Sequence, residues 1–354
     1  APSEFSLDWK PENFKYKREK DSYGVRKIPQ IKSARDDGSL CDSVVKLADS
    51  VPAIHELAGL SMLDHRIPFL QGFLDSADEE GYIQAKIAGF TNTLRFKHKA
   101  PLANIPGFDA PSGPKIRCCL LSPDGYEVCG SDMSSLEDRT KLHYMFPYDP
   151  DYVEAMSEPG YCPHLDLALQ DGALSGTQVQ DYKDGDMVNK HIRHLYKTTN
   201  YSALYGISAG GLARDLNCSE TKAQKLLEVY WKRNWAIQEV AEEQTTKTCL
   251  GVKWLFNPLS KIWYWLKVEK DVFSTLNQGT GTYCFDTWIK YVRRKRPQMT
   301  AQFHDEGVWV VKKGHRDDMT KLLRWAISKT NDQLKLNREL DIDIQYGDNY
   351  ADVH

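Results

Sequence analysis

The stretch that decides our interpretation of this chain is RHLYKTTNYSALYG, residues 193–206. Its cations and aromatic rings recur at every fourth position, at Arg193, Lys197, Tyr201 and Tyr205. Four residues advance an α-helix by about 400°, so in a helix these side chains lie along one slowly drifting stripe, about 18 Å long. Two cations followed by two rings match the order of phosphates, sugar and base in a nucleotide. A basic, solvated helix end followed by aromatic core packing is the alternative, and the spacing alone does not decide between them.

Acidic residues at two distant places in the sequence favour the nucleotide interpretation. Asp132 ends the segment 126–132, which predicts a strand running into a helix, and Asp305-Glu306 lies in a tight turn between the predicted strands 299–303 and 307–311. Two aspartates brought together from such segments repel each other unless cations lie between them. Hard oxygen ligands suit Mg²⁺, and two ions about 3.5–4 Å apart can activate an attacking oxygen and stabilise a leaving one. Taken singly, each aspartate is more simply explained as a surface or capping residue.

The other segments predict a mixture of helices and short strands, hence an α+β fold. Ser134 and Glu137 have capping-box spacing at the start of the helix after Asp132. Segments 1–50 and 94–107 contain charged and turn-forming residues rather than periodic apolar ones. The apolar periodicity predicts helices at 53–77, over most of 163–244 with stops at Gly206 and Gly210-Gly211, at 273–294 and at 317–334, and strands at 82–87, in a hairpin-like segment at 254–265, and at 341–346.

The composition indicates an intracellular chain with two or three lobes. Its 354 residues, 41% of them hydrophobic, can bury a large core but are long for one compact unit. No apolar run is long enough for a membrane span, and the polar N-terminus does not resemble a signal peptide. The eight cysteines lack CxxC spacing, which is typical of reduced thiols. Because the net charge is −3, polyanion binding would have to come from basic clusters at 97–99, 190–197 and 293–296.

Three segments, in this order, resemble the polymerase motifs of family A (DNA polymerase I-like) DNA polymerases. They are 131–139, SDMSSLEDR, similar to the family's D-Y-S-Q-I-E-L-R; 193–206 with its continuation 208–217; and His304-Asp305-Glu306. Further matches are Thr93-Leu94-Arg95 with Asn104-Ile105-Pro106, similar to T-G-R…N-I-P; 274–279, similar to N-A-P-M-Q-G; and 347–354, similar to G-x-N-W-x-x-x-H. Together they extend from about residue 50 to the last residue.

The resemblance implies a right-hand polymerase of class α+β, with an antiparallel palm sheet, helical fingers and a partial helical thumb. The implied divisions are a partial thumb at 1–80, palm at 81–155, fingers at 156–268 and the second part of the palm at 269–354. No D-x-E segment of a proofreading exonuclease precedes residue 50, so we expect a fragment of a longer protein or one half of a split enzyme. Tyr201 and the short connections are most similar to phage replicative enzymes.

The resemblance also implies how metal ions are held. Asp132 and Asp305 would bind two Mg²⁺ ions, which Mn²⁺ can replace, with the Met133 carbonyl as a further ligand. Glu306 would support them as a neighbouring carboxylate.

The nucleotide is implied to lie along the helix. Arg193, Lys197 and His164 would grip the triphosphate, with Lys197 acting in catalysis. Tyr201 would lie under the sugar and base, and Glu137 would exclude a ribose 2′-hydroxyl in addition to capping its helix.

The implied template and primer contacts come from four segments. Tyr205, with Gly206, would mark where the template base stacks, and Arg95 and Gln278 would contact the minor groove, where acceptors recur at similar positions for every base pair. The remaining implied primer-template contacts are His304, near the primer terminus, and Ser274.

Several positions depart from the family's pattern. The departures are Met133 for tyrosine, Ser135 for glutamine, Asp138 for leucine, Ser274 for asparagine, Lys270 for arginine and Leu94 for glycine. A backbone carbonyl at Met133 keeps its function, whereas the changes at Ser274 and Lys270 affect minor-groove checking.

The implied reaction is DNA-directed DNA synthesis by a nucleotidyltransferase. The primer 3′-hydroxyl attacks the α-phosphate in line, pyrophosphate leaves, and catalysis consists of positioning and electrostatics. The implied partners are primer-template DNA, deoxynucleoside triphosphates (dNTPs), and a separate exonuclease–thumb portion or a processivity factor, in a bacterial or phage-infected cytoplasm and without a membrane.

Two other functions stay open. A single-subunit RNA polymerase shares the Asp, the Lys…Tyr-Gly helix and the His-Asp pair, but Glu137, Glu306 and Gln278 argue against it. The other is a fragment that binds primer-template DNA without catalysis, and the intact Asp132 and Asp305 argue against it.

Overall fold

The protein divides into two compact units. The structure, a computed structural model, describes residues 14–21, 24–31, 44–45, 51–52 and 60–353, apart from 109, 111, 159, 186 and 217. The first unit comprises 1–88, 98–128 and 346–354, and the second comprises 89–97 and 129–345. Among the described residues, no helix combines the length and apolar character needed to cross a bilayer.

The first unit contains a hairpin that the sequence analysis did not predict. β1 (Phe14–Asp21) pairs antiparallel with β2 (Gly24–Ile31). α2 (Leu60–Ser76) agrees with the predicted helix and ends before the acidic turn, while residues 53–59 of that prediction lie outside the described part of the chain. The hairpin was missed because every residue of β1 from Lys17 to Asp21 is charged, so the apolar alternation of Phe14 and Tyr16 does not continue along the strand.

A buried arginine joins the C-terminal segment to the rest of the first unit. Arg117, in α3 (Gly113–Arg117), donates from Nε to the Pro106 carbonyl at 2.8 Å. Its guanidinium lies 4.8 Å from the centroid of the Tyr350 ring. Both contacts lie within the first unit.

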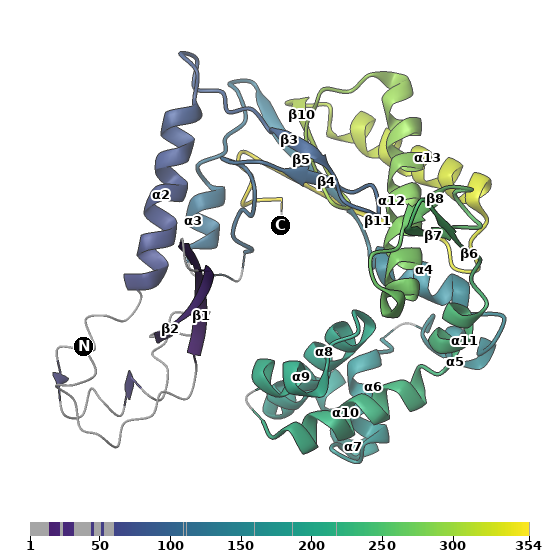
Figure 1. Cartoon of the computed structure of the whole chain (residues 1–354). Coiled ribbons are helices and arrows are strands. Elements are labelled where there is room, and N and C mark those ends of the chain that lie inside the picture. The colour runs from purple at the N-terminus through teal and green to yellow at the C-terminus, as the bar shows by residue number, and fades with distance from the viewer. Residues whose placement is uncertain are drawn as a thin grey trace. The chain divides into compact units, whose positions relative to one another are not determined.

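A four-stranded sheet forms the centre of the second unit. Its order is β11-β5-β10-β9, made of β5 (Tyr126–Met133), β9 (Met299–Phe303), β10 (Glu306–Lys312) and β11 (Ile342–Gly347). β9 and β10 pair antiparallel around the turn at 304–305, as predicted. The order places β5 directly beside β10, although they are far apart in the sequence (Figure 1).

Two long helices pack on this sheet. α12 (Val272–Val292) and α13 (Arg316–Leu334) agree closely with their predicted ranges. The buried Trp288 ring of α12 lies 5.8 Å from the Trp309 ring of β10, and its Nε1 donates to the Leu323 carbonyl of α13. One tryptophan thus joins both helices to the sheet.

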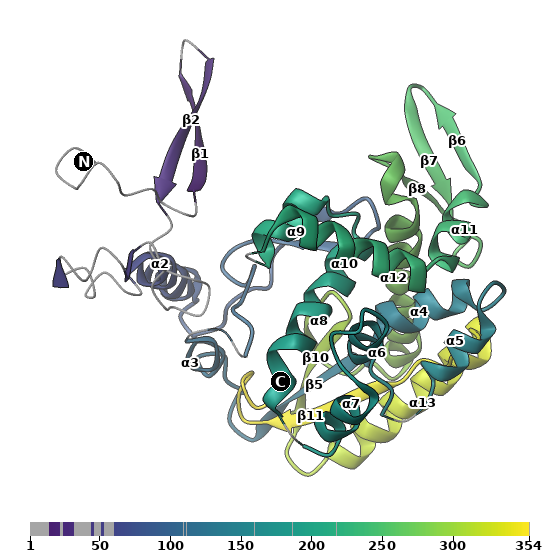
Figure 2. The same cartoon turned by 90° about the horizontal axis from the view of Figure 1, so that it is seen from below.

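The predicted helical region contains a cluster of short helices around one apolar core. Figures 1 and 2 both show α6, α8, α9 and α10 side by side. The helices are α4 (Leu136–Met145), α5 (Pro150–Ala155), α6 (Pro163–Gln170), α7 (Gly176–Lys183), α8 (Lys190–Leu204), α9 (Ala209–Asp215), α10 (Glu220–Arg233) and α11 (Ala236–Glu242).

Small sheets and 3₁₀ turns complete the described chain. The predicted hairpin at 254–265 is present, with an additional strand before it. The elements are β3 (Ile87–Phe90), β4 (Phe96–His98), β6 (Thr246–Cys249), β7 (Val252–Phe256), β8 (Trp263–Trp265), η3 (Met187–Asn189), η4 (Glu269–Asp271) and η5 (Arg293–Lys295).

Two predicted boundaries are wrong. The strand predicted at 82–87 begins only at Ile87. Ile83 and Ala85 are less exposed than their neighbours, as the alternation predicted, but none of the described strands pairs with them. Gly210-Gly211 does not stop a helix. Instead the Ser208 hydroxyl accepts the Gly211 N–H at 3.2 Å and caps α9, and a Cβ on Gly211 would lie 2.8 Å from the Ile207 side chain.

The predicted capping box is also wrong. Ser135, not Ser134, occupies the N-cap of α4, with φ 51° and no side-chain capping bond. The Ser134 hydroxyl donates to Asp343 Oδ2 at 2.7 Å, on the neighbouring strand β11. Tertiary partners have therefore replaced the local bonds that the spacing suggested.

Candidate active site

The backbone holds the two predicted aspartates at the ends of two adjacent strands. Asp132 is the penultimate residue of β5, and Asp305 lies in the turn between β9 and β10. The Met133 N–H donates to the Asp305 carbonyl at 3.1 Å. His304 enters this turn with φ 48°, a left-handed conformation that reverses the chain in a very short space. The backbone pairing thus places both carboxylate-bearing residues together where β5 ends and β10 begins.

Burial, with nearby negative charge, raises the pKa of both carboxyl groups. Partial burial and the carboxylates of Asp343, Asp305 and Glu306 raise the pKa of Asp132. Burial raises the pKa of Asp305, and Glu137 adds to this, whereas Arg95 opposes it. A cation placed here would relieve the repulsion and favour the ionised forms.

The donor set fits a hard divalent cation that keeps part of its own shell. Among the described residues, no group of three or more His, Cys, Asp or Glu side chains is arranged to hold a metal ion. Asp132, Asp305 and the neighbouring backbone carbonyls supply hard oxygen donors, which suit Mg²⁺ with water and substrate phosphates completing its coordination. Glu306 is buried at the start of β10. The next residue is a glycine, and no side chain fits there because a Cβ on Gly307 would lie 2.3 Å from the Trp309 ring.

The predicted stripe lies on one exposed face of α8. Arg193, Lys197 and Tyr201 lie within the helix, and Tyr205 is its C-cap residue. The rings of Tyr201 and Tyr205 are 43% and 40% exposed, so they are not core packing. The opposite face buries Tyr196, Thr199 and Ala203. Gly206, with φ 68°, ends the helix as predicted.

His164 reaches the same stripe from α6. Its ring centroid lies 5.7 Å from that of Tyr201. Burial, together with the positive charges of Arg193, Lys141 and Lys197, lowers its pKa to about 4. The Asn200 amide nitrogen lies 3.1 Å from Nδ1, which is then the acceptor, so the proton of the neutral ring is on Nε2. The structure thus brings a neutral Nε2–H donor beside two cations.

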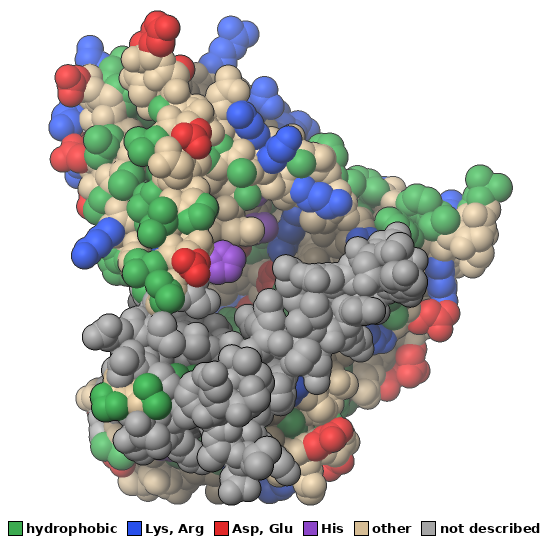
Figure 3. Space-filling model, turned by 60° about the vertical axis from the view of Figure 1, so that its left-hand side comes forward, with side chains coloured by type: hydrophobic (Ala, Val, Ile, Leu, Met, Phe, Trp, Pro, Cys, Tyr) green, Lys and Arg blue, Asp and Glu red, His purple; other side chains and the backbone are tan. Residues whose placement is uncertain are grey.

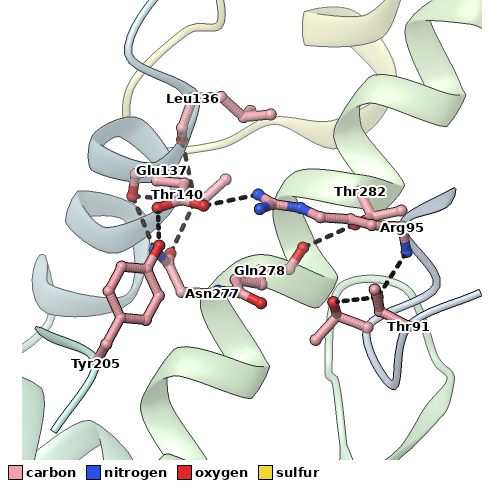
Figure 4. A network of polar contacts seen from close by, with 10 residues as sticks. Thr91, Arg95, Leu136, Glu137, Thr140, Tyr205, Asn277, Gln278 and Thr282 are labelled. Atoms are coloured by element: carbon pink, nitrogen blue, oxygen red, sulfur yellow. Dashed lines mark hydrogen bonds and ion pairs between the residues drawn. The ribbon is translucent and has the colours of Figure 1, made fainter. Parts of the chain in front are cut away.

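Glu137 lies at the centre of a polar network (Figure 4). Its carboxylate accepts from Arg95 Nη2 at 2.7 Å and from the Tyr205 hydroxyl. The Asn277 amide donates to the Glu137 carbonyl at 2.9 Å. Burial and Glu137 raise the pKa of Tyr205 to about 12, while a hydrogen bond from Gln278 opposes the rise. Four of the predicted residues thus meet here, and their position is fixed by α12.

Two further predicted residues lie near the beginning of α12. The Lys270 ammonium donates to the Gly206 carbonyl at 2.8 Å, at the C-terminal end of α8, where a helix favours positive charge. The Ser274 hydroxyl donates to the Asp271 carbonyl at 3.2 Å, within its own helix turn. Lys270 therefore binds the end of α8, whereas the Ser274 hydroxyl is hydrogen-bonded within its own helix turn.

The described surface has mixed charge. On the face shown in Figure 3, basic and acidic side chains are interspersed among apolar ones, as a net charge of −3 implies.

Comparison with known families then decides the assignment. The family model for DNA polymerase family A matches residues 47–352. The chain belongs to DNA polymerase family A.

Relatives of this family A chain are longer proteins. DNA polymerase I of Mycobacterium tuberculosis (strain ATCC 25618 / H37Rv) is 23% identical over 85% of this chain and 34% of its own length. DNA polymerase I of Rhizobium leguminosarum is 28% identical over 44% of this chain and 14% of its own, and the thermostable DNA polymerase I of Thermus filiformis is 23% identical over 74% and 32%. This chain therefore spans about a third or less of these relatives.

A solved structure confirms the predicted right-hand α+β fold. The POL domain of Pol1 from M. smegmatis, in complex with DNA primer-template and dNTP, matches with a TM-score of 0.70 at 20% identity. The match covers 91% of this chain and 58% of that one.

Sequence reasoning missed three residues around the site of this family A chain. Asp343 crowds Asp132 from β11, and its alternation with Asp341 in the predicted strand was the available signal. Asn277 was inside the recognised 274–279 segment but was not singled out. Lys141 is buried and lies 3.1 Å from Asp138, an ion pair with i,i+3 spacing on α4.

Proposed function

We propose that this chain is a DNA-directed DNA polymerase that extends a primer on a template and releases pyrophosphate. One observation carries the proposal: Asp132, near the end of β5, and Asp305, in the turn that leads into the neighbouring strand β10, lie in the same unit that presents Arg193 and Lys197 on α8. Primer-template DNA and dNTPs are the proposed partners, supported by the complex in which the M. smegmatis domain was solved.

Two Mg²⁺ ions, held by Asp132, Asp305 and the Met133 carbonyl, are the proposed cofactors. When bound, they would lower the pKa of the primer 3′-hydroxyl and offset the negative charge of the phosphates. Glu306 would add to the negative potential that attracts them, as its effect on the pKa of Asp132 suggests.

The cations of α8 bind and orient the triphosphate in this proposal. Arg193 and Lys197 hold the phosphates, and the neutral His164 donates a hydrogen bond from Nε2–H to a phosphate oxygen. Lys197 stabilises charge as it develops at the α-phosphate, so it acts on the rate more than on ground-state binding.

Glu137 selects the sugar. Since Arg95 and Tyr205 both bind its carboxylate, the group is held in one place and can exclude a 2′-hydroxyl by direct overlap. Tyr201 lies under the incoming sugar, and Tyr205 with Gly206 marks the template position.

The primer-template contacts form the last part of the proposal. Arg95 and Gln278 contact the minor groove, with His304 and Ser274 near the primer. The thumb, palm and fingers divisions after residues 80, 155 and 268, a cytoplasmic location and a separate processivity factor belong to the same proposal.

Primer extension with either dNTPs or ribonucleoside triphosphates tests the function. We expect extension with dNTPs, which Asp305→Asn abolishes and Asp332→Asn, at an exposed carboxylate, leaves intact. Extension with ribonucleotides alone would identify an RNA polymerase, and primer-template binding without extension would identify a binding fragment.

Variants of Glu137 test sugar selection. Glu137→Ala should raise ribonucleotide use relative to deoxynucleotide, because the overlap with the 2′-hydroxyl is removed. Glu137→Gln keeps the shape and is the matched control. Unchanged selectivity in Glu137→Ala would leave this residue as a partner of Arg95 and Tyr205 only.

A further inference from the structure

An apolar cavity lies away from Asp132 and Asp305, which together form the acidic corner, between α13, the end of β10 and the segment that follows α12. Its volume is about 820 Å³, within the range of ligand and side-chain pockets. The apolar lining residues include Pro297, Val310, Met319, Leu322 and Trp325, the last 38% exposed. An opening of this size with an exposed tryptophan is suited to receive an apolar side chain.

Two lysine side chains are part of the cavity lining. Lys295 and Lys312 line it, and Lys295 belongs to the exposed basic run 293–296 that the sequence analysis singled out. The acidic lining residue Asp318 lies 3.1 Å from His315 Nδ1. The edge of the cavity is therefore mainly cationic in a chain whose net charge is −3.

Aromatic contacts join the basic run to the cavity lining. The Arg294 guanidinium lies 4.7 Å from the centroid of the Tyr291 ring. The Tyr291 ring in turn lies edge-on to Trp325, with centroids 6.1 Å apart. Charge and apolar surface thus belong to one packed group of residues rather than to two unrelated patches.

The cavity is separate from the proposed catalytic residues. β10 begins beside Asp305 and ends at Lys312, which lines the cavity. At about 3.3 Å per residue, the strand places Lys312 roughly 20 Å from Asp305. A ligand in this cavity would therefore lie well away from the proposed metal ligands.

We propose that this cavity binds an acidic peptide segment that carries an apolar side chain. Its carboxylates would face Lys295, Lys312 and the 293–296 run, and its apolar side chain would enter the cavity beside Trp325 and Leu322. Nucleic acid would use the cations but has no aliphatic side chain to fill the cavity, whereas a neutral apolar ligand would not use the cations. Charge complementarity and apolar burial together favour the peptide.

Fluorescence anisotropy on the full chain tests this proposal. The probe is a fluorescein-labelled hexapeptide with four acidic residues followed by Leu-Phe. Two control peptides replace either the acidic residues by serine or Leu-Phe by alanine. We expect saturable binding of the probe and at least about ten-fold weaker binding of each control peptide, with affinity falling as salt rises.

Two variants locate the binding. Lys295→Glu, at an exposed position, and Trp325→Ala should each weaken probe binding by about ten-fold, the scale of one important interface residue. Lys222→Glu, an exposed lysine on α10, is the matched control and should bind like wild type. Melting temperatures check that the variants are folded.

Several outcomes would overturn the inference. These are no probe binding by wild type, equal binding of the Leu-Phe and alanine peptides, or wild-type affinity in Lys295→Glu. Loss of duplex DNA binding, rather than of peptide binding, in Lys295→Glu would assign the basic run to nucleic acid. Because primer extension is measured separately, a failure here does not depend on whether the proposed polymerase activity is correct.

Discussion

The acidic corner and the α8 stripe form the candidate site in opposite ways. Asp132 and Asp305 come from segments far apart in the chain and meet because β5 and β10 are neighbours, joined by the Met133–Asp305 backbone hydrogen bond. Arg193, Lys197 and Tyr201 come from one helix, where local spacing alone places them on one face. The corner thus depends on long-range strand pairing, and the stripe depends on helix geometry.

The two regions also differ in electrostatic cost. In the corner, partial burial and like charges raise the pKa of both aspartates, so without a cation the ionised corner destabilises the fold. On the stripe, Lys197 is exposed and its charge is solvated. Substitutions in the corner should therefore change chemistry and stability together, whereas substitutions on the stripe should change mainly the chemistry.

The largest effect is expected in the corner. Asp132→Asn and Asp305→Asn should each lower primer extension by at least about 10³-fold, because a direct metal ligand is lost. Primer-template binding should stay within a few-fold of wild type. Steady-state extension and anisotropy measure these quantities, with Asp332→Asn as the control. Either variant keeping more than a tenth of wild-type turnover would remove that residue from the site.

The same variants should also stabilise the metal-free protein. A carboxyl whose pKa is raised by folding costs stability progressively as pH rises from the unfolded pKa to the folded pKa, and the cost is absent where the group is protonated in both states. Asp132→Asn should therefore raise the melting temperature in EDTA at pH 7, and the gain should vanish below the unfolded pKa, about 4. A lower melting temperature at pH 7 would show that Asp132 is stabilised by its surroundings.

On the stripe, Lys197→Ala should lower turnover by about 10²–10³-fold, the scale of one electrostatic donor to the developing charge. Arg193→Ala should in addition weaken nucleotide binding. Lys190→Ala, at the exposed start of the same helix, is the matched control. Single-turnover kinetics over a range of dNTP concentrations separates rate from binding. If DNA affinity alone changes in both variants, α8 is a DNA-binding face.

At the other end of the stripe, Tyr201→Phe should change sugar selection by roughly 10²-fold, since one hydroxyl in a dry site can leave a polar neighbour unpaired. We expect wild type to use dideoxy- and deoxynucleotides about equally and the variant to reject the dideoxynucleotide. Insertion of matched single nucleotides measures this, with Tyr182→Phe on α7 as the control. Equal selectivity in wild type and Tyr201→Phe would show that this ring does not contact the sugar.

The smallest effect concerns His164, whose pKa of about 4 results from burial and from the neighbouring cations. Because the unfolded imidazole titrates near 6.5, the unfolded state binds more protons between these values. The free energy of unfolding should therefore decrease as pH is lowered, by about 2 kcal/mol between pH 7 and pH 5. The decrease should be smaller in His164→Gln. Urea denaturation at pH 7 and pH 5 tests this, with the exposed His315→Gln as control. The same pH dependence in His164→Gln as in wild type would assign the loss to other groups.

Local patterns predicted the elements whose bonds are local. α8, α12, α13 and the β9–β10 turn lie within a few residues of their predicted ranges, because helix and hairpin bonds join residues that are close in sequence. The strand predicted at 82–87 fails for the converse reason: the alternation was real, but a strand also needs a neighbour, which the sequence does not show.

By itself, the sequence determined the helical stripe, the acidic turn and the family, since each rests on residue types at fixed short spacings. Only the tertiary structure decided that Glu137 binds Arg95 and Tyr205 instead of capping α4, and that Asp343 crowds Asp132. It also decided that the basic run borders an apolar cavity. The physical reason is the same in each case: strand order and helix packing set which distant side chains meet, and a charged group bonds to whichever partner that packing brings within reach.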